Sequence, residues 1–115
     1  MGKKDTFSTD TLTDSAYYIL LSLLEPRHGY AIMQYIVELT DDEFTIGPAT
    51  MYTLIKKFLK HDLIQLYDEQ DRRKLYVVTD SGRKAVTADL ERRQAMVNHG
   101  HEVIQMAEGK EKNEN

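Results

Sequence analysis

Apolar residues in the first quarter of the chain recur at intervals of three or four positions. The pattern is carried by Leu12, Ala16, Ile19, Leu20, Leu23 and Leu24. This spacing places the apolar side chains on one face, and it predicts a helix over about 12–24. Thr13 or Asp14 can cap its start, and Pro26 prevents the helix from continuing.

The same period predicts two further helices. The second opens at residues 28–30, and its buried side is formed by Ile32, Met33, Ile36, Val37 and Leu39. An acidic turn at 40–43 separates it from a third helix. Gly47 and Pro48 open that helix, because proline is well suited to the first helical position. It is expected to end at about Lys60, and its inward face is formed by Met51, Ile55 and Phe58.

The period then changes from helical to strand-like and back again. Two β-prone runs at 63–67 and 74–78 flank a charged loop at 68–73, which predicts a hairpin with a polar tip. Thr79-Asp80-Ser81-Gly82 can cap a fourth helix over about 81–107. Gly100 is a weak point of that helix, because glycine costs about 1 kcal/mol inside a helix, and the sequence leaves open whether the helix bends or ends there.

This order of elements predicts a mostly α fold with a small β-hairpin, namely a winged helix-turn-helix followed by a long C-terminal helix. A fourth helix of this length would be roughly 40 Å long, and so small a unit cannot cover its apolar side. We therefore expect a DNA-binding domain at 1–79, ordered from about residue 12, and a dimerisation helix at 80–107. Residues 108–115 are expected to be disordered.

Charge is distributed unevenly along the chain. The 115 residues carry a net charge of −4, but residues 44–93 contain ten Lys/Arg against seven Asp/Glu, whereas the segments before and after them are acidic. The central excess is compatible with a nucleic-acid partner. The absence of cysteine excludes disulfides, and no apolar run approaches the length of a membrane span or a signal peptide, so a cytoplasmic location is expected.

The outward face of the third helix has a composition suited to DNA. In a helix-turn-helix this element enters the major groove, where small residues approach base edges and lysines neutralise phosphates. The candidate residues are Thr50, Tyr52, Thr53, Lys56, Lys57 and Lys60. A solvated helix face is the alternative, because lysines near a helix C-terminus also complement its dipole.

Arg72, Arg73 and Lys74 form a second basic cluster, at the expected hairpin tip. In a winged helix this tip meets the phosphates or the minor groove. The alternative is a charge-balanced loop, because acidic residues precede the cluster at positions 68, 69 and 71.

These segments together resemble the PadR family of transcriptional regulators. The resemblance covers roughly residues 12–90, and it is carried by His28-Gly29-Tyr30, Gly47-Pro48-Ala49-Thr50-Met51-Tyr52, Leu63-Ile64, Arg73-Lys74-Leu75-Tyr76 and Thr79-Asp80-Ser81-Gly82-Arg83. It implies a homodimer that binds a pseudo-palindromic operator, usually as a repressor. It also implies that Thr50 and Tyr52 face DNA, that Lys56-Lys57 lies on the backbone, and that Tyr30 opens a helix crossing a phosphate strand. The short tail resembles the subfamily with a single C-terminal helix.

The resemblance further implies that the last helix packs against the first helix of the partner. The apolar positions Val86, Leu90, Val97 and Ile104 of the last helix would face Tyr17, Leu20, Leu21 and Leu24. Packing within one chain is the alternative. Some relatives bind aromatic or drug-like effectors between the subunits, and the residues suited to such a pocket are Tyr17, Tyr18, Met96 and Met106. The same residues could instead be plain interface core.

No constellation in the sequence points to catalysis, a metal or a cofactor. The histidines lack metal-ligand spacing, since His99 and His101 stand two apart and would diverge on a helix. There is also no glycine-rich phosphate loop or nucleophile motif, so an enzyme is not expected. The competing hypothesis is a winged-helix protein-interaction module without specific DNA binding, which the acidic N-terminal third and the apolar pair Leu75 and Val77 would favour.

Overall fold

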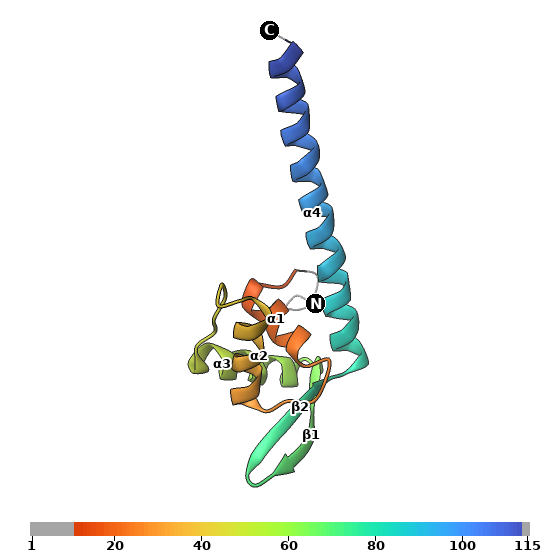
Figure 1. The fold of residues 1–115 in the computed structure, drawn as a ribbon. Helices are drawn as coiled ribbons and strands as arrows, with labels where there is room; N and C mark the ends of the chain where they lie inside the picture. Colours follow the sequence, from red (N-terminus) through yellow and green to blue (C-terminus); the bar gives the residue numbers. More distant parts are fainter. Residues whose placement is uncertain (1–10, 114–115) are drawn as a thin grey trace.

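The computed structural model describes residues 11–113, and their elements follow the predicted order (Figure 1). They are α1 (Asp14–Ser22), α2 (Gly29–Leu39), α3 (Pro48–Lys60), β1 (Ile64–Gln70), β2 (Arg73–Val78) and α4 (Asp80–Asn113). The first three helices pack together, the hairpin extends from one end of this unit, and α4 runs past α1 and projects away from it (Figure 1). The expectation that order begins at about residue 12 concerns mainly residues 1–10, which lie outside the described residues.

Local capping explains where the helices begin. Thr13 is the N-cap of α1, and its hydroxyl accepts a hydrogen bond from the Ala16 amide at 3.1 Å. Pro48 occupies the first turn of α3, after Gly47. Before α4, the Thr79 hydroxyl accepts from the Gly82 amide at 3.1 Å and donates to the Asp62 carbonyl at 2.6 Å, which ties the start of α4 to the turn after α3.

The core lies between the three helices and the base of the hairpin. Its most deeply buried apolar side chains are Ile19, Leu20, Leu23, Ile32, Ile36, Met51, Phe58 and Ile64. The beginning of α4 adds Ala85 and Val86 to it. The prediction that Leu20 and Val86 lie at a dimer interface is therefore wrong, because both are buried within their own chain where α4 still packs on α1 and β2.

The hairpin is longer than its composition indicates. The expected loop at 68–73 is wrong, because only Asp71 and Arg72 form the turn, with φ angles of 51° and 67°. Residues 68–70 pair instead with 73–75, and this register places Glu69 opposite Lys74. Opposite charges across a ladder stabilise a pair whose side chains both face water, so a polar segment can remain in strand conformation.

A short backbone bridge fixes the hairpin to the α1–α2 connection. The Arg27 amide donates to the Tyr76 carbonyl at 3.1 Å, and the Tyr76 amide donates to the Arg27 carbonyl at 2.9 Å. The Val78 amide donates to the Leu23 carbonyl at 2.8 Å. Because these bonds join β2 to the residues just before α2, the hairpin keeps a defined position relative to that helix.

The last helix is continuous over 34 residues. The helix does not break at its weak point near Gly100, the expected end near residue 107 is wrong, and residues 108–113 are helical rather than disordered. A single glycine costs only about 1 kcal/mol, which is small for a helix of this length. The helix is roughly 50 Å long. No helix among residues 11–113 has the length and apolar content needed to cross a bilayer.

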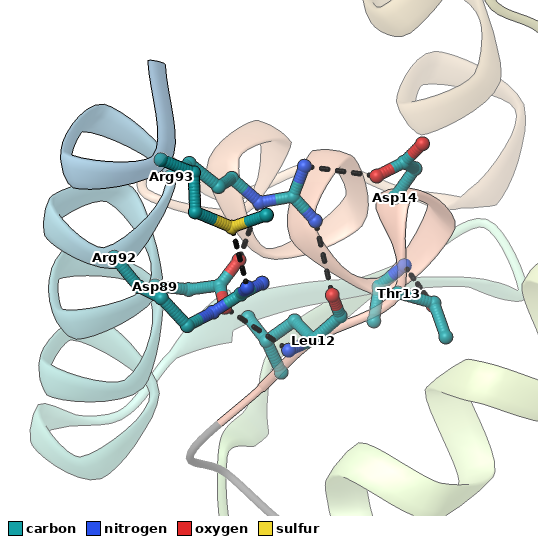
Figure 2. Close-up of polar contacts among 8 residues, drawn as sticks. Leu12, Thr13, Asp14, Asp89, Arg92 and Arg93 are labelled. Atoms are coloured by element: carbon teal, nitrogen blue, oxygen red, sulfur yellow. Dashed lines mark hydrogen bonds and ion pairs between the residues drawn. The ribbon is translucent and has the colours of Figure 1, made fainter. Parts of the chain in front are cut away.

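Asp89 of α4 is a buried carboxylate that joins this helix to the start of α1 (Figure 2). It accepts hydrogen bonds from the Leu12 amide at 3.1 Å, the Arg92 Nε at 3.0 Å and the Arg93 Nε at 2.6 Å. Arg93 also donates to the Leu12 carbonyl at 3.0 Å and to the Asp14 carboxylate at 2.8 Å (Figure 2). We call these residues the Asp89 cluster. Every described side chain from residue 94 to residue 108 is exposed, so the cluster marks the last firm contact of α4 with its own domain.

The same contacts determine the charge state of Asp89. Burial alone would raise the pKa of its carboxyl group, but the hydrogen bonds from Arg93, Leu12 and Arg92 outweigh burial and lower it. A buried charge is tolerated only when it is paired in this way, and removing one partner of such a pair is costly.

We predict that Asp89→Asn lowers the free energy of unfolding by about 3 kcal/mol, because it leaves the Arg92 and Arg93 side chains without their buried counter-ion. Since the folded-state pKa is lowered, the Asp89 contribution is present above the unfolded-state value of about 3.9 and is lost as pH falls through the folded-state value. Urea unfolding measured from about pH 2 to about pH 7 should show the stabilities of the wild type and Asp89→Asn converging in acid. Glu91→Gln, which removes an exposed carboxylate from the same helix, is the control. Equal stabilities of the two variants at neutral pH would contradict the anchoring role.

Candidate nucleic-acid interface

One side of α3 is exposed beside the hairpin, and the opposite side is fixed in the core by Met51, Ile55 and Phe58. The centre of the exposed side is formed by side chains at helical spacing, namely Ala49, Thr53, Lys56 and Lys60. Thr50 and Lys57 are exposed on one flank of this row and Tyr52 on the other. The predicted outward face of α3 is therefore exposed as a single surface.

A notch of about 450 Å³ lies where the start of α2, α3 and the hairpin meet. It is lined by His28, Gly29, Tyr30, Tyr52, Arg72, Arg73, Lys74 and Tyr76. The notch brings together three groups that the sequence analysis treated separately: Tyr30 of α2, Tyr52 of α3 and the basic hairpin tip. Tyr30 and Tyr52 are 69% and 50% exposed, so both rings remain available to a ligand.

Thr50 and Thr53 do not line this notch. They line a separate hollow of about 420 Å³ that also includes Thr13 and Ser15 at the start of α1. The lysines at positions 56, 57 and 60 line neither hollow. The exposed side chains of α3 are therefore bordered by the notch on the hairpin side and by the second hollow on the α1 side.

The cations of this surface are unpaired. Within residues 11–113, no ion pair involves Lys56, Lys57, Lys60, Arg72, Arg73 or Lys74. The guanidinium groups of Arg27, Arg92 and Arg93, by contrast, all contact carboxylates. At the hairpin tip, Asp68 accepts from the Glu69 amide at 2.8 Å and from Gln70 rather than from a cation, and Glu69 lies opposite Lys74 without forming an ion pair. Three acids still balance the three cations of the tip in formal charge, so the charge-balanced loop stays the competing interpretation. Cations without internal partners are available to neutralise phosphates.

Tyr76 is held in its neutral form within the notch. Burial raises the pKa of Tyr76, and the neighbouring Tyr52 and Glu69 raise it further. A neutral phenol can donate a hydrogen bond to a phosphate oxygen or a base acceptor. The arrangement thus combines positive charge with hydroxyl donors, which suits an anionic polymer.

Several residues of the notch are missed by reasoning from the sequence. The sequence analysis uses His28, Gly29 and Tyr76 only as parts of a helix start, of a strand and of the family resemblance, and it does not single out Arg27, which precedes the notch residues without lining the notch. Their common feature is that they meet through the Arg27–Tyr76 bridge, which joins segments about 50 positions apart. Neither period nor composition signals such a pairing, because it depends on the tertiary position of the hairpin.

The residues suggested for an effector pocket are not assembled within one chain. The Arg93 guanidinium lies over the Tyr17 ring, 4.4 Å from the ring centroid. Tyr18 packs against Phe44, with ring centroids 4.8 Å apart. The Met96 sulfur accepts a hydrogen bond from Arg92, and Met106 lies ten residues further along α4, roughly 15 Å away. Only a second chain could complete such a pocket. Among the described residues no group of three His, Asp or Glu side chains is arranged to hold a metal ion.

Comparison with known proteins gives a consistent result. The model of the "Transcriptional regulator PadR-like family" matches residues 19–88. An uncharacterized protein of Lysinibacillus sphaericus is 36% identical over 74 residues, which cover 61% of this chain and 67% of that protein.

Two solved structures show the same fold. A transcriptional regulator from Clostridium thermocellum matches with a TM-score of 0.67 and 22% identity over 77% of this chain and 90% of its own. Bacillus subtilis PadR, solved in complex with operator DNA, matches with a TM-score of 0.58 and 24% identity. That match covers 67% of this chain but only 46% of the Bacillus protein, so this chain corresponds to about half of its length.

Proposed function

Because this chain belongs to the PadR-like family of transcriptional regulators, we propose that it binds operator DNA sequence-specifically as a homodimer. The family comprises transcriptional regulators rather than enzymes. The family assignment leaves open which residues contact DNA, which surface joins two copies, and whether binding represses or activates transcription.

The observation that carries the DNA proposal is the set of unpaired cations on the side of α3 and the hairpin tip. With α3 in the major groove, Thr53 and Tyr52 would approach base edges while Lys56 and Lys57 meet the backbone. The notch with Tyr30 and the hairpin tip would then lie along the flanking phosphates. The complex of Bacillus subtilis PadR with operator DNA supports this, because the two proteins share the fold.

The dimer proposal depends on the outer part of α4. From Leu90 onward, this helix exposes a broad stripe of large apolar side chains, namely Leu90, Met96, Val97, Val103, Ile104 and Met106, each 49% to 65% exposed. Apolar surface of this extent on an isolated helix is unfavourable in water, and an identical stripe on a second copy would cover it. The half-buried Tyr17, Leu21 and Leu24 of α1 would extend the interface.

A two-fold dimer implies an operator with matching symmetry. Its half-sites would be pseudo-palindromic, with centres about 34–36 Å apart or a multiple of that. We propose repression by occupancy of such a site. Release by an aromatic effector would require Tyr17 and Tyr18 to form a pocket together with Met96 and Met106 across the interface, since one chain does not assemble it.

We predict that Lys56→Gln and Arg73→Gln each weaken binding to operator and random duplexes alike. Each substitution removes one phosphate contact, so the slope of log affinity against log salt concentration should fall by about 0.9 per substitution. Fluorescence anisotropy is measured with a duplex that the wild-type protein selects from genomic fragments and with a random duplex of equal length.

Lys110→Gln is the matched control, because it makes the same change in net charge on an exposed position far along α4. Its salt slope should equal that of the wild type. If the wild-type protein shifts neither duplex at micromolar concentration and low salt, the DNA proposal fails and the protein-interaction module becomes the better reading.

We predict that Val97→Glu converts the dimer to a monomer, because it places a charge in the centre of the apolar stripe. Val97 is 52% exposed in the single chain, so the fold and its melting temperature should change little. Sedimentation equilibrium measures the molecular mass, and operator affinity should fall because the two half-sites are no longer linked.

Asn98→Glu is the control for this substitution, since it adds the same charge about 100° further round the helix. Truncation after Ala95 is a second test, because it removes most of the stripe and keeps the Asp89 cluster. A Val97→Glu protein that still sediments as a dimer would rule out this surface as the interface.

A further inference from the structure

Gly29, the first residue of α2, is buried, and its backbone does not explain why it is glycine. No described glycine has a positive φ, so any L-amino acid could adopt this conformation. The constraint is instead one of space. A Cβ atom at Gly29 would lie 2.5 Å from the Tyr52 hydroxyl oxygen, 3.1 Å from Tyr52 Cζ and 3.0 Å from Met51 Cε.

The phenol of Tyr52 therefore lies directly over the first residue of α2. A contact of 2.5 Å cannot be tolerated, so one of the two groups would have to move. Met51 is fully buried, so the core surrounds its side chain. The Tyr52 ring is rigid, and its exposed side faces the notch, so it would be displaced towards the hairpin residues.

Among the other described glycines only Gly82 is crowded, and its contact is with backbone rather than with a side chain of the proposed DNA surface. A Cβ at Gly47, one residue before α3, would meet nothing within 4 Å, and the same holds for Gly100 and Gly109. At Gly82 the added atom would overlap the backbone carbonyl of Leu63, which is a contact within the core. At Gly29 the closest atom is the polar end of a side chain on the proposed DNA surface.

We propose that Gly29 is a positioning residue for DNA recognition: the absence of a side chain there seats the Tyr52 hydroxyl at the rim of the notch, in the place from which it contacts DNA. This inference rests on the proposed function, because Tyr52 is taken to touch DNA. Its first step, displacement of the Tyr52 ring by a side chain at position 29, concerns the free protein and can be measured without DNA.

The test compares wild type, Gly29→Ala, Tyr52→Phe and the double variant. Gly29→Ala should weaken operator binding about tenfold, which is within the range of a single polar contact to DNA. Tyr52→Phe removes the oxygen atom that the alanine would strike, so in that background the same substitution should change affinity less than about twofold, as expected when two sites are directly coupled. Alanine has a higher helix propensity than glycine, so a loss of affinity caused by Gly29→Ala cannot come from helix propensity.

Melting temperatures provide a second measurement of the same coupling. Gly29→Ala should lower the melting temperature in the presence of the Tyr52 hydroxyl and change it much less in the Tyr52→Phe background. If Gly29→Ala alone is too unstable to assay, the folded double variant still tests the proposal by comparison with Tyr52→Phe.

Carbon–proton NMR spectra of the tyrosine rings in the free proteins separate this inference from the proposed function. In Gly29→Ala the Tyr52 ring signals should move. If they do not move, the inference is overturned whether or not DNA binds. If Gly29→Ala costs the same affinity with and without the Tyr52 hydroxyl, glycine acts by admitting the DNA backbone itself, and the inference is again wrong. If the ring signals move but no duplex binds to the wild type, only the proposed function has failed.

Discussion

The pairing of the buried Asp89 carboxylate fixes the orientation of α4 relative to the domain formed by α1, α2, α3 and the hairpin. Asp89 can stay charged inside the protein only while Arg92, Arg93 and the Leu12 amide surround it. Those partners come together only when α4 lies alongside the start of α1. The cluster therefore sets the direction in which the outer part of α4 leaves the domain, and so it would also set the distance between the two DNA-binding surfaces of a dimer.

The proposed DNA surface is assembled in a comparable way, by contacts between segments that are distant in sequence. The Arg27–Tyr76 bridge places the hairpin next to the start of α2, and the glycine at position 29 lets α3 bring Tyr52 over the same point. Each element alone would present only a few cations or a tyrosine. Their shared position turns these separate features into one surface of unpaired positive charge with hydroxyl donors.

The apolar period was sufficient to predict the helices, their order and the exposed face of α3, because these depend on which side of each element meets the core. It failed wherever a residue's role is decided by a distant partner. Val86 fits the period of the exposed stripe, yet it is buried because α4 has not yet left β2. Residues 68–70 look like a loop but pair as a strand, and Asp89 looks like an ordinary surface acid. No local pattern distinguishes these cases, since burial there depends on tertiary contacts.

The net charge of −4 is compatible with binding DNA because one group of acidic residues, the turn at 40–43, lies away from the notch. The N-terminal end of α2 meets the notch, and the acidic turn at 40–43 lies at its other end (Figure 1). Eleven residues of helix separate the two ends by roughly 16 Å, about twice the screening length of 8 Å at physiological salt. The acids of that turn are thus largely screened from a phosphate at the notch. A phosphate there meets the cations of the hairpin tip and the positive end of the α2 dipole, together with the acids of the same hairpin, so the local field rather than the total charge governs binding.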